Sequence, residues 1–270
     1  MTAETRELET ITVERLEGVV TITLRRPERK NAINGTMWDE FLAEIRAIAG
    51  SATDRAVVIT GAGGEFCSGA DVGDMAPARG GDTGPGQHSL AAMRHVGDIC
   101  LALHRLPQPT VAKVRGVAVG AGANLALVCD LVVAGETARF SEIFARRGLS
   151  VDFGGSWILP RVVGMHRAKE LALLADIIDA EQAEHMGLVN RVLPDAELDG
   201  FVADWAGRLA AGPPIALAMT KRLLNNSFNV TLEEALDDEG LSQTVNFSTQ
   251  DTAEAVMAFM EKRTPDFRGR

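Results

Sequence analysis

Apolar and polar residues alternate along residues 11–24, on either side of Glu17 and Gly18, and this pattern predicts a hairpin of two short strands. Residues 35–49 carry apolar side chains at helical spacing, and residues 56–60 form the continuous apolar run that is typical of a buried strand. A strand, a helix and a second strand at this spacing predict a right-handed parallel crossover. The beginning of the chain therefore indicates an α/β fold.

A second informative pattern lies at residues 113–139. A strand pattern there ends in the small residues Gly120, Ala121 and Gly122, and an apolar helix pattern follows at residues 123–129. Such a turn leaves the first N–H groups of the helix unpaired, with the positive end of the helix dipole behind them. We therefore expect an oxyanion site at this turn. Tight packing of the helix on the strand is the alternative that the small residues leave open.

Another turn of the same kind follows the strand expected at residues 56–60. Residues 61–71 are rich in glycine and lead into a helix start expected at residues 72–75. The N–H of Ala70 is the natural counterpart of the N–H of Ala121. Strand, glycine turn and helix thus occur twice, which predicts two backbone donors that converge on one ligand atom.

Composition and charge narrow the range of functions. With 270 residues, of which 46% are hydrophobic and 24% charged, the chain can bury one large core, with or without a small appendage. The formal net charge of −10 disfavours a nucleic-acid partner, because phosphate binding needs a concentrated basic surface. Cys67, Cys100 and Cys129 lack metal-ligand spacing, which predicts free thiols in a reducing compartment. No leader and no membrane-length apolar run stands out, so we expect a cytoplasmic protein without a membrane partner.

Two further segments carry candidate chemistry. Residues 76–87 are rich in glycine and proline, which is typical of a mobile lid or an irregular excursion, and His88 lies at their end. Asp152 lies between two apolar residues, just before a short helix expected to open at Gly154. Burial raises the pKa of such a carboxyl group and the helix dipole lowers it, so the net direction stays open. An aspartate at the helix N-cap is the alternative role.

The C-terminal part of the chain differs in composition. From residue 198 onwards the pattern is helical, with a break at residues 212–214. We therefore expect a core domain at residues 1–199 and a helical region at residues 200–270 that packs elsewhere.

Several motifs, in order along the chain, resemble the crotonase superfamily, also called the enoyl-CoA hydratase/isomerase family. They are RPERKNAI, GEFCSGAD, GVAVGAGANLALVCD, MGLVNRVLP and the terminal AFMEKRTPDFRGR. The resemblance implies an α/β fold with a crotonase-like spiral of ββα units. It also implies a C-terminal helical trimerisation region, so that the chain forms a homotrimer or a homohexamer built from two trimers.

The same resemblance implies an acyl-CoA substrate whose thioester carbonyl lies between the N–H groups of Ala70 and Ala121. Charge collects on that oxygen as an enolate, and one such donor is typically worth about 3 kcal/mol in the barrier. The family needs no metal and no permanently bound cofactor, since coenzyme A arrives as part of the substrate.

The sequence departs from the family at the two glutamates with which enoyl-CoA hydratases activate water. Asn124 and Phe144 align with these positions, and neither can transfer a proton. Glu142 lies two positions from Phe144, and a local shift could bring it in. Asp152 aligns instead with the working aspartate of some isomerases, so we expect it to act as acid and base during movement of a double bond. Hydration or dehydration with Asp152 or Glu142 is the second hypothesis, and a non-catalytic acyl-CoA-binding protein is the third.

For coenzyme A, the resemblance points to two loops and a few cations. The acyl pocket is expected beside the lid at residues 76–87, and an apolar Phe144 should make it more apolar than the pocket of a hydratase. The residues expected to bind substrate or coenzyme A are Arg26, Lys30, Ala32, Ser68, Ala70, Asp71, Asn124, Phe144, Trp157 and, from a neighbouring subunit, Lys262.

Overall fold

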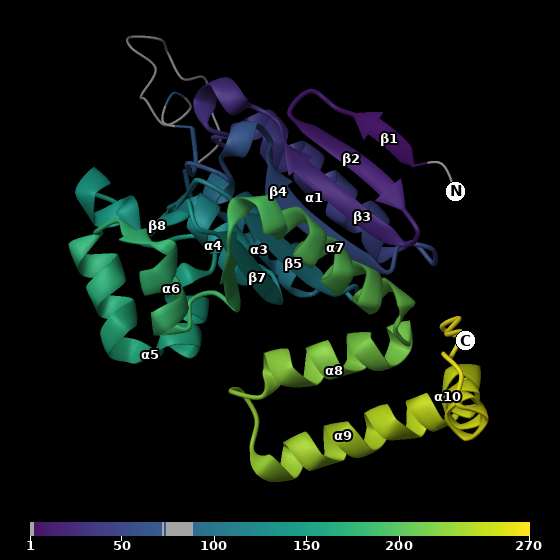
Figure 1. Cartoon of the computed structure of the whole chain (residues 1–270). Coiled ribbons are helices and arrows are strands. Elements are labelled where there is room, and N and C mark those ends of the chain that lie inside the picture. The colour runs from purple at the N-terminus through teal and green to yellow at the C-terminus, as the bar shows by residue number, and fades with distance from the viewer. Residues whose placement is uncertain (1–2, 72, 74–88) are drawn as a thin grey trace.

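The computed structural model describes residues 3–71, 73 and 89–270. The lid expected at residues 76–87, the neighbouring His88 and most of the helix start expected at residues 72–75 lie outside the described residues. The described part forms a layered α/β core and an arm of three helices that extends from it (Figure 1).

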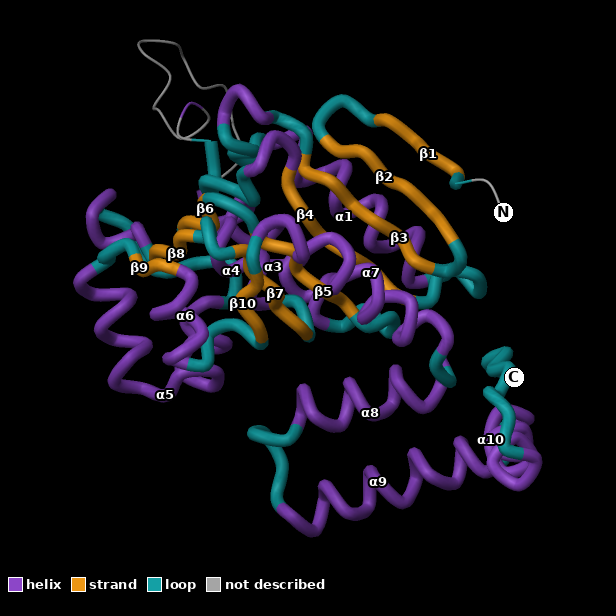
Figure 2. Tube along the Cα trace, viewed as in Figure 1, coloured by secondary structure: helices purple, strands orange, loops and turns teal. Residues whose placement is uncertain are grey.

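One large sheet forms the centre of the core (Figure 2). The strand order is β1-β2-β3-β4-β5-β7-β10, in which β1, β2 and β3 are antiparallel and the strands from β3 to β10 run parallel. Glu17 and Gly18 both have positive φ and connect β2 to β3, so the predicted hairpin is confirmed. The strands of this sheet are β1 (Glu4–Glu7), β2 (Ile11–Leu16), β3 (Val19–Leu24), β4 (Ala56–Gly61), β5 (Thr110–Val114), β7 (Leu131–Gly135) and β10 (Arg191–Leu193).

A smaller sheet stands beside the carboxyl ends of these strands. It contains β6 (Val117–Val119), β8 (Arg139–Ser141) and β9 (Ile178–Asp179), in the order β6-β8-β9. Isolated bridges join Cys67 to Ala118 and Ile33 to Ala70, so earlier turns of the chain approach the same layer. Each successive turn of the spiral therefore adds a strand to the large sheet, an extended segment beside the small sheet, and then a helix. The predicted crotonase-like spiral is confirmed.

Helices cover both faces of the large sheet. Val57 and Ile59 point into the main core, which they share with helices α1, α3, α4 and α5, whereas Val58 points to the other face, under α7. The helix predicted at residues 35–49 is confirmed as α1. The helices of the core are α1 (Gly35–Ala49), α3 (Ser89–His104), α4 (Ala121–Val128), α5 (Gly155–Leu174), α6 (Ala180–Met186) and α7 (Asp195–Ala211), and the short 3₁₀ turns are η1 (Pro27–Arg29), η2 (Ala62–Gly64) and η3 (Ile143–Arg147).

Two local expectations need correction. Residues 116–119 do not finish the preceding strand, because the chain turns at Gly116 and places β6 in the other sheet. The short helix expected at Gly154 is α5, which runs 20 residues with a kink at Gly164.

The boundary expected at residues 199 and 200 falls inside α7. Leu198, Val202 and Ala206 of this helix are buried against β4, β5 and β7, so α7 belongs to the core. The arm begins after it and consists of α8 (Pro214–Asn226), α9 (Leu232–Phe247) and α10 (Gln250–Glu261). Asp251 at the start of α10 accepts hydrogen bonds from the backbone of Arg268 and Gly269, which ties the C-terminal tail to this helix.

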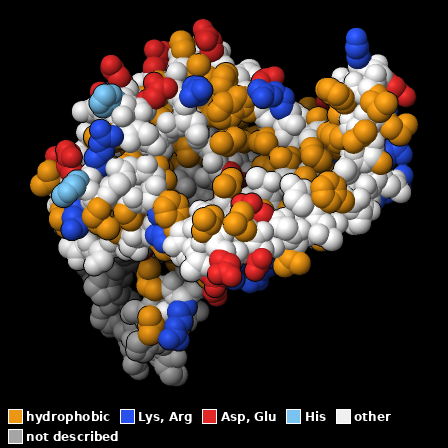
Figure 3. Space-filling view, turned by 90° about the horizontal axis from the view of Figure 1, so that it is seen from below, with side chains coloured by type: hydrophobic (Ala, Val, Ile, Leu, Met, Phe, Trp, Pro, Cys, Tyr) orange, Lys and Arg blue, Asp and Glu red, His pale blue; other side chains and the backbone are white. Residues whose placement is uncertain are grey.

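The arm exposes many large apolar side chains. Viewed from below, apolar side chains gather on the lobe that holds α10 (Figure 3). Examples are Leu232 at 77%, Phe247 at 73% and Phe259 at 85% exposure. Apolar area of this extent marks a surface that another molecule covers.

The attachment of α7 gives a first prediction. Leu198→Ala should lower the free energy of unfolding by about 2–5 kcal/mol, because it leaves a cavity between α7 and the sheet. Urea denaturation of the purified protein measures this loss. Ala203→Ser on the exposed face of the same helix is the matched control and should change stability by less than about 0.5 kcal/mol. Equal effects of the two substitutions would contradict the assignment of α7 to the core.

Candidate active site

The two glycine turns meet backbone to backbone. Gly69 has φ +97°, and a Cβ atom built on it would lie 2.8 Å from the carbonyl oxygen of Val119 and 3.7 Å from the nitrogen of Ala121. A side chain at residue 69 would therefore push the turns apart. Ala70, which follows Gly69, is brought next to the start of α4 at Ala121.

The N–H groups of Ala70 and Ala121 have no acceptor among the described residues, unlike that of Gly120, which donates to the oxygen of Ser141. The bridge between the first turn and Ile33 uses the oxygen of Gly69 and the nitrogen of Asp71, which leaves the N–H of Ala70 unused. Ala121 is the first residue of α4, and within the described part of the chain its N–H also has no acceptor. Ala121 is only 3% exposed. A buried donor without a partner is rare in folded proteins, so these groups suit a ligand oxygen.

Phe144 covers the second turn from one side. Its Cζ atom lies 3.6 Å from the position that a Cβ atom on Gly120 would take, and the side chain is 5% exposed. The ring therefore makes the neighbourhood of the α4 N-terminus dry. It supplies no proton donor or acceptor there.

Asp152 precedes α5, and its side chain does not cap this helix. The N-cap residue is Gly154, with no capping side chain, so the alternative role of Asp152 as an N-cap is wrong. Its Oδ1 atom is buried and has no hydrogen-bond partner among the described residues. Burial raises the pKa of the Asp152 carboxyl group to about 6. A carboxyl group in this state can take up and release a proton near neutral pH.

The backbone at Asp152 is held in an uncommon conformation. Phe153 has φ +45°, which is unusual for a residue with a bulky side chain. Its ring stacks on Trp38 of α1, with the centroids 5.2 Å apart and the planes at 23°. The stack holds the strained backbone in place, and strain of this kind is concentrated at functional sites.

Asn124 connects α4, the helix that follows the second glycine turn, to Asp152. It is fully buried in α4, and its Nδ2 donates to the backbone oxygen of Asp152 at 2.9 Å and to Oε2 of Glu142 at 3.3 Å. Burial raises the pKa of Glu142 to about 7, the Asn124 bond opposes this shift, and the charge of Asp152 adds to it. Sequence comparison identified Asn124 only as the replacement of a glutamate and missed this bridge.

The two loops expected to bind coenzyme A lie side by side. The N–H of Ser68 donates to the oxygen of Lys30 at 3.0 Å, and the hydroxyl of Ser68 donates to the oxygen of Arg29 at 3.1 Å. Ala32, in the first loop, is 8% exposed.

The cations expected near these loops already have carboxylate partners. Nη1 of Arg26 lies 2.9 Å from Oδ2 of Asp71, and Nζ of Lys30 lies 2.9 Å from Oε1 of Glu65. The pKa of Asp71 is lowered by a hydrogen bond from the backbone of Gly73 and by Arg26. Lys262 ends α10 and is exposed on the arm.

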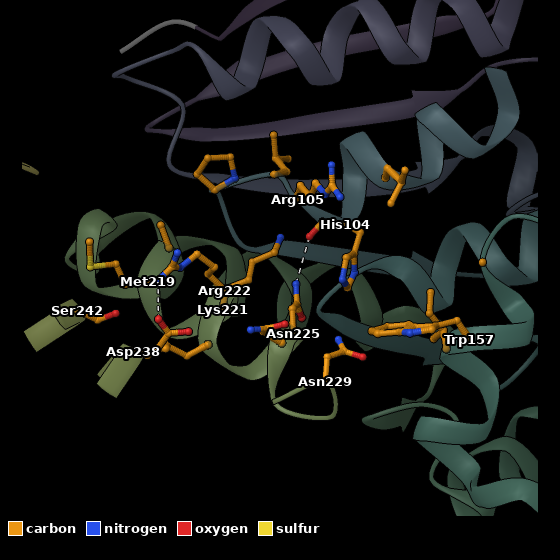
Figure 4. A pocket seen from close by; sticks show the side chains of 18 of the residues that line it. His104, Arg105, Trp157, Met219, Lys221, Arg222, Asn225, Asn229, Asp238 and Ser242 are labelled. Carbon is orange, nitrogen blue, oxygen red and sulfur yellow. Dashed lines mark hydrogen bonds and ion pairs between the residues drawn. The ribbon is translucent and has the colours of Figure 1, made fainter. Parts of the chain in front are cut away.

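Trp157 lines a cavity of about 950 Å³ between the core and the arm (Figure 4). The ring of His104 meets Trp157 edge-on at 5.3 Å, and the guanidinium group of Arg161 lies 3.8 Å from the centre of that ring. Burial lowers the pKa of His104, and the charge of Lys221 lowers it further. Phe144 is not part of the lining, so the structure does not bring the two expected pocket residues together in this cavity.

The three cysteines are free and buried, as predicted. Burial raises the pKa of Cys67 and of Cys129 to about 12, and that of Cys100 to about 11. Over the residues that the structure describes, no helix is both long and apolar enough to cross a membrane. The same residues contain no group of three or more His, Cys, Asp or Glu side chains that could hold a metal ion.

Known proteins share this architecture over their whole length. Residues 14–270 match the family model described as Enoyl-CoA hydratase/isomerase. A Rhodobacter capsulatus protein named "Probable enoyl-CoA hydratase" is 41% identical over 262 residues, which are 97% of this chain and 98% of that protein. The 1,2-epoxyphenylacetyl-CoA isomerase of Escherichia coli is 38% identical over 255 residues, 94% of this chain and 96% of the isomerase.

A comparison with solved structures agrees with these sequence matches. The crystal structure of an enoyl-CoA hydratase from Bacillus anthracis matches with a TM-score of 0.88 at 30% identity, covering 100% of both chains. The motifs, the spiral fold and these relatives agree. The chain belongs to the enoyl-CoA hydratase/isomerase family, the crotonase superfamily, and is an enzyme of hydratase or isomerase type.

Proposed function

We propose that the protein moves the double bond of an enoyl-CoA thioester, with Asp152 as acid and base. The observation that supports this most is the Asp152 carboxyl group, which is partly buried and has a raised pKa, on a residue whose backbone oxygen accepts a hydrogen bond from Asn124 of α4. The N–H groups of Ala70 and Ala121 would bind the thioester oxygen. Coenzyme A would enter as part of the substrate, and no other cofactor takes part in the proposed steps.

The proposed reaction needs one proton carrier. The Asp152 carboxylate removes a proton from C2 of a 3-enoyl thioester, and the electron pair moves through the carbonyl to give a dienolate. The two backbone donors stabilise the charge on its oxygen, each by about 3 kcal/mol. Asp152 then returns the proton at C4, so the double bond moves and no atom is gained or lost.

Coenzyme A would follow the paired loops around Lys30 and Ser68. Arg26 and Lys30 would exchange a carboxylate partner for a phosphate group, and Lys262 would be supplied by a neighbouring subunit. Three buried free thiols are typical of a reducing compartment, which supports a cytoplasmic location.

Hydration is the second candidate, because a close relative carries the name of an enoyl-CoA hydratase and Glu142 lies near Asp152. Incubation with 2-enoyl-CoA and 3-enoyl-CoA separates the two reactions. Mass spectrometry detects the addition of one water in hydration and no change of mass in isomerisation. A non-catalytic acyl-CoA-binding protein would convert neither substrate.

Asp152→Asn tests the proposed acid and base. We expect kcat to fall by about 10²–10⁴-fold, while acyl-CoA binding persists, because the amide cannot carry the proton. In heavy water the wild type should introduce deuterium at C2 or C4, and the variant should not. Asp204→Asn on the exposed face of α7 is the control and should exchange normally. If the wild type neither isomerises nor exchanges deuterium with any enoyl-CoA tested, proton transfer by Asp152 is excluded.

The pH dependence follows from the same carboxyl group. Its pKa is raised to about 6, and only the ionised form can act as the base, so activity should be half lost near pH 6. Below pH 6, kcat/KM should fall about tenfold for each pH unit, because a single protonation inactivates the Asp152 carboxylate as a base. Stopped assays of isomerisation between pH 4.5 and pH 7 measure this limb, in buffers for which circular dichroism shows the native fold. A limb centred near pH 4 would instead indicate an ordinary exposed carboxyl group.

We also propose that the arm assembles the chain into a trimer, or into a hexamer of two trimers. The exposed apolar residues of α9 and α10, together with the family resemblance, support this assembly. Analytical ultracentrifugation should give three or six chains for the wild type. Phe259→Glu should shift the protein to smaller species, whereas Gln243→Glu, an exposed polar change on the same arm, should not. A wild type that stays monomeric at high concentration would contradict the assembly.

A further inference from the structure

We propose that Glu142 is a positioning residue for Asp152: while it is protonated, this buried carboxyl group limits the site to one negative charge and anchors the Asn124 amide. The inference rests on the proposed function of Asp152 as acid and base. It assigns to Glu142 a role different from that of the family's water-activating glutamates.

The first support is the geometry of the bridge. The Nδ2 atom of Asn124 carries two hydrogens, and its two acceptors are the backbone oxygen of Asp152 and Oε2 of Glu142. A Cβ atom on Gly155 would come within 2.5 Å of both polar atoms of the Asn124 amide, so the amide is packed tightly against the first turn of α5. Glu142 therefore holds the Asn124 amide in place, and this amide in turn holds the backbone of Asp152.

The second support is the charge around Glu142. The side chain is 3% exposed, and among the described residues no lysine or arginine forms an ion pair with it. A buried carboxylate without a cation is costly, so the protonated form is favoured.

The groups that face Glu142 can be named element by element. From α4 it meets the uncharged Asn124, and from the segment before α5 it feels the charge of Asp152. Asp152 in turn faces Cys100 of α3, whose thiol stays neutral because its pKa is raised to about 11. Asp152 and Glu142 are thus two interacting carboxyl groups, and among the described residues neither forms an ion pair with a cation.

This pair has a direct consequence for catalysis. When Asp152 is ionised and Glu142 is protonated, the site holds one negative charge, and transfer of the substrate proton to Asp152 moves that charge to the enolate. When Glu142 ionises as well, enolate formation takes place beside a second anion, which opposes it. Activity should therefore rise as Asp152 ionises near pH 6 and fall as Glu142 ionises near pH 7.

Glu142→Gln separates the charge of Glu142 from its hydrogen bond. The amide oxygen can still accept from Asn124, but the side chain cannot ionise. We expect the alkaline fall of kcat to disappear, so that the variant exceeds the wild type severalfold at pH 8.5, while the acid limb remains. Glu142→Met fills a similar volume without an acceptor, and its kcat should be about tenfold below that of Glu142→Gln at all pH values, with little change of KM, since Asp152 loses its anchor. Glu136→Gln on the surface is the control, and its pH profile should match that of the wild type.

A second measurement does not depend on turnover. Titration of ¹³C-labelled glutamate carboxyl groups by NMR should show one glutamate with an apparent pKa near 7, absent in Glu142→Gln. In Asp152→Asn this pKa should fall, because the neighbouring charge is gone.

Three results would overturn the inference. They are an unchanged alkaline limb in Glu142→Gln, a Glu142 titration near its ordinary value, and a loss of activity in Glu142→Gln as large as in Asp152→Asn. The last result would make Glu142 a proton carrier. Failure of the wild type both to isomerise any enoyl-CoA and to exchange solvent deuterium would instead reject the proposed function, so the two failures can be told apart.

Discussion

The close approach of two backbone turns is the constraint on which the rest of the site depends. The backbone of Gly69 lies against Val119 and Ala121 so closely that no side chain can be accommodated between them. This contact joins consecutive turns of the spiral and at the same time brings Ala70, the neighbour of Gly69, close to Ala121. Packing needs these small residues, and the proposed ligand binding would need the same ones, so the two explanations of the glycine turns do not exclude each other.

The exclusion of water from the site determines how its backbone N–H groups and carboxyl groups behave. Phe144 covers the turn at Gly120, and the carboxyl groups of Asp152 and Glu142 are at least partly buried, with no ion-pair partner in the part of the chain that the structure describes. In such surroundings the neutral form of a carboxyl group is favoured, and donors that would be weak in water bind developing charge strongly. The site thus holds carboxyl groups able to exchange protons near neutral pH.

Rigidity comes from contacts between distant segments. Trp38 of α1 holds the ring of Phe153, and Asn124 of α4 holds the backbone of Asp152. The helices that carry these two side chains belong to different turns of the spiral, so Asp152 is fixed by the core rather than by its own loop. The arm contributes little to this core, and its exposed apolar residues mark a surface that another molecule covers.

The sequence by itself determined the hairpin at residues 11–24, the helix at residues 35–49 and the two glycine turns, because each depends on a local period or on a residue with special backbone freedom. Family motifs added the spiral and pointed to Asp152. Only the tertiary structure decided that β6 leaves the first sheet, that α7 belongs to the core and that the Asp152 side chain does not cap α5. The tertiary structure also decided that Asn124 connects Glu142 to the backbone of Asp152. The reason is physical: Asn124 lies 18 residues from Glu142 and 28 from Asp152, and contacts at such separations arise from the packing of whole elements, which no local pattern records.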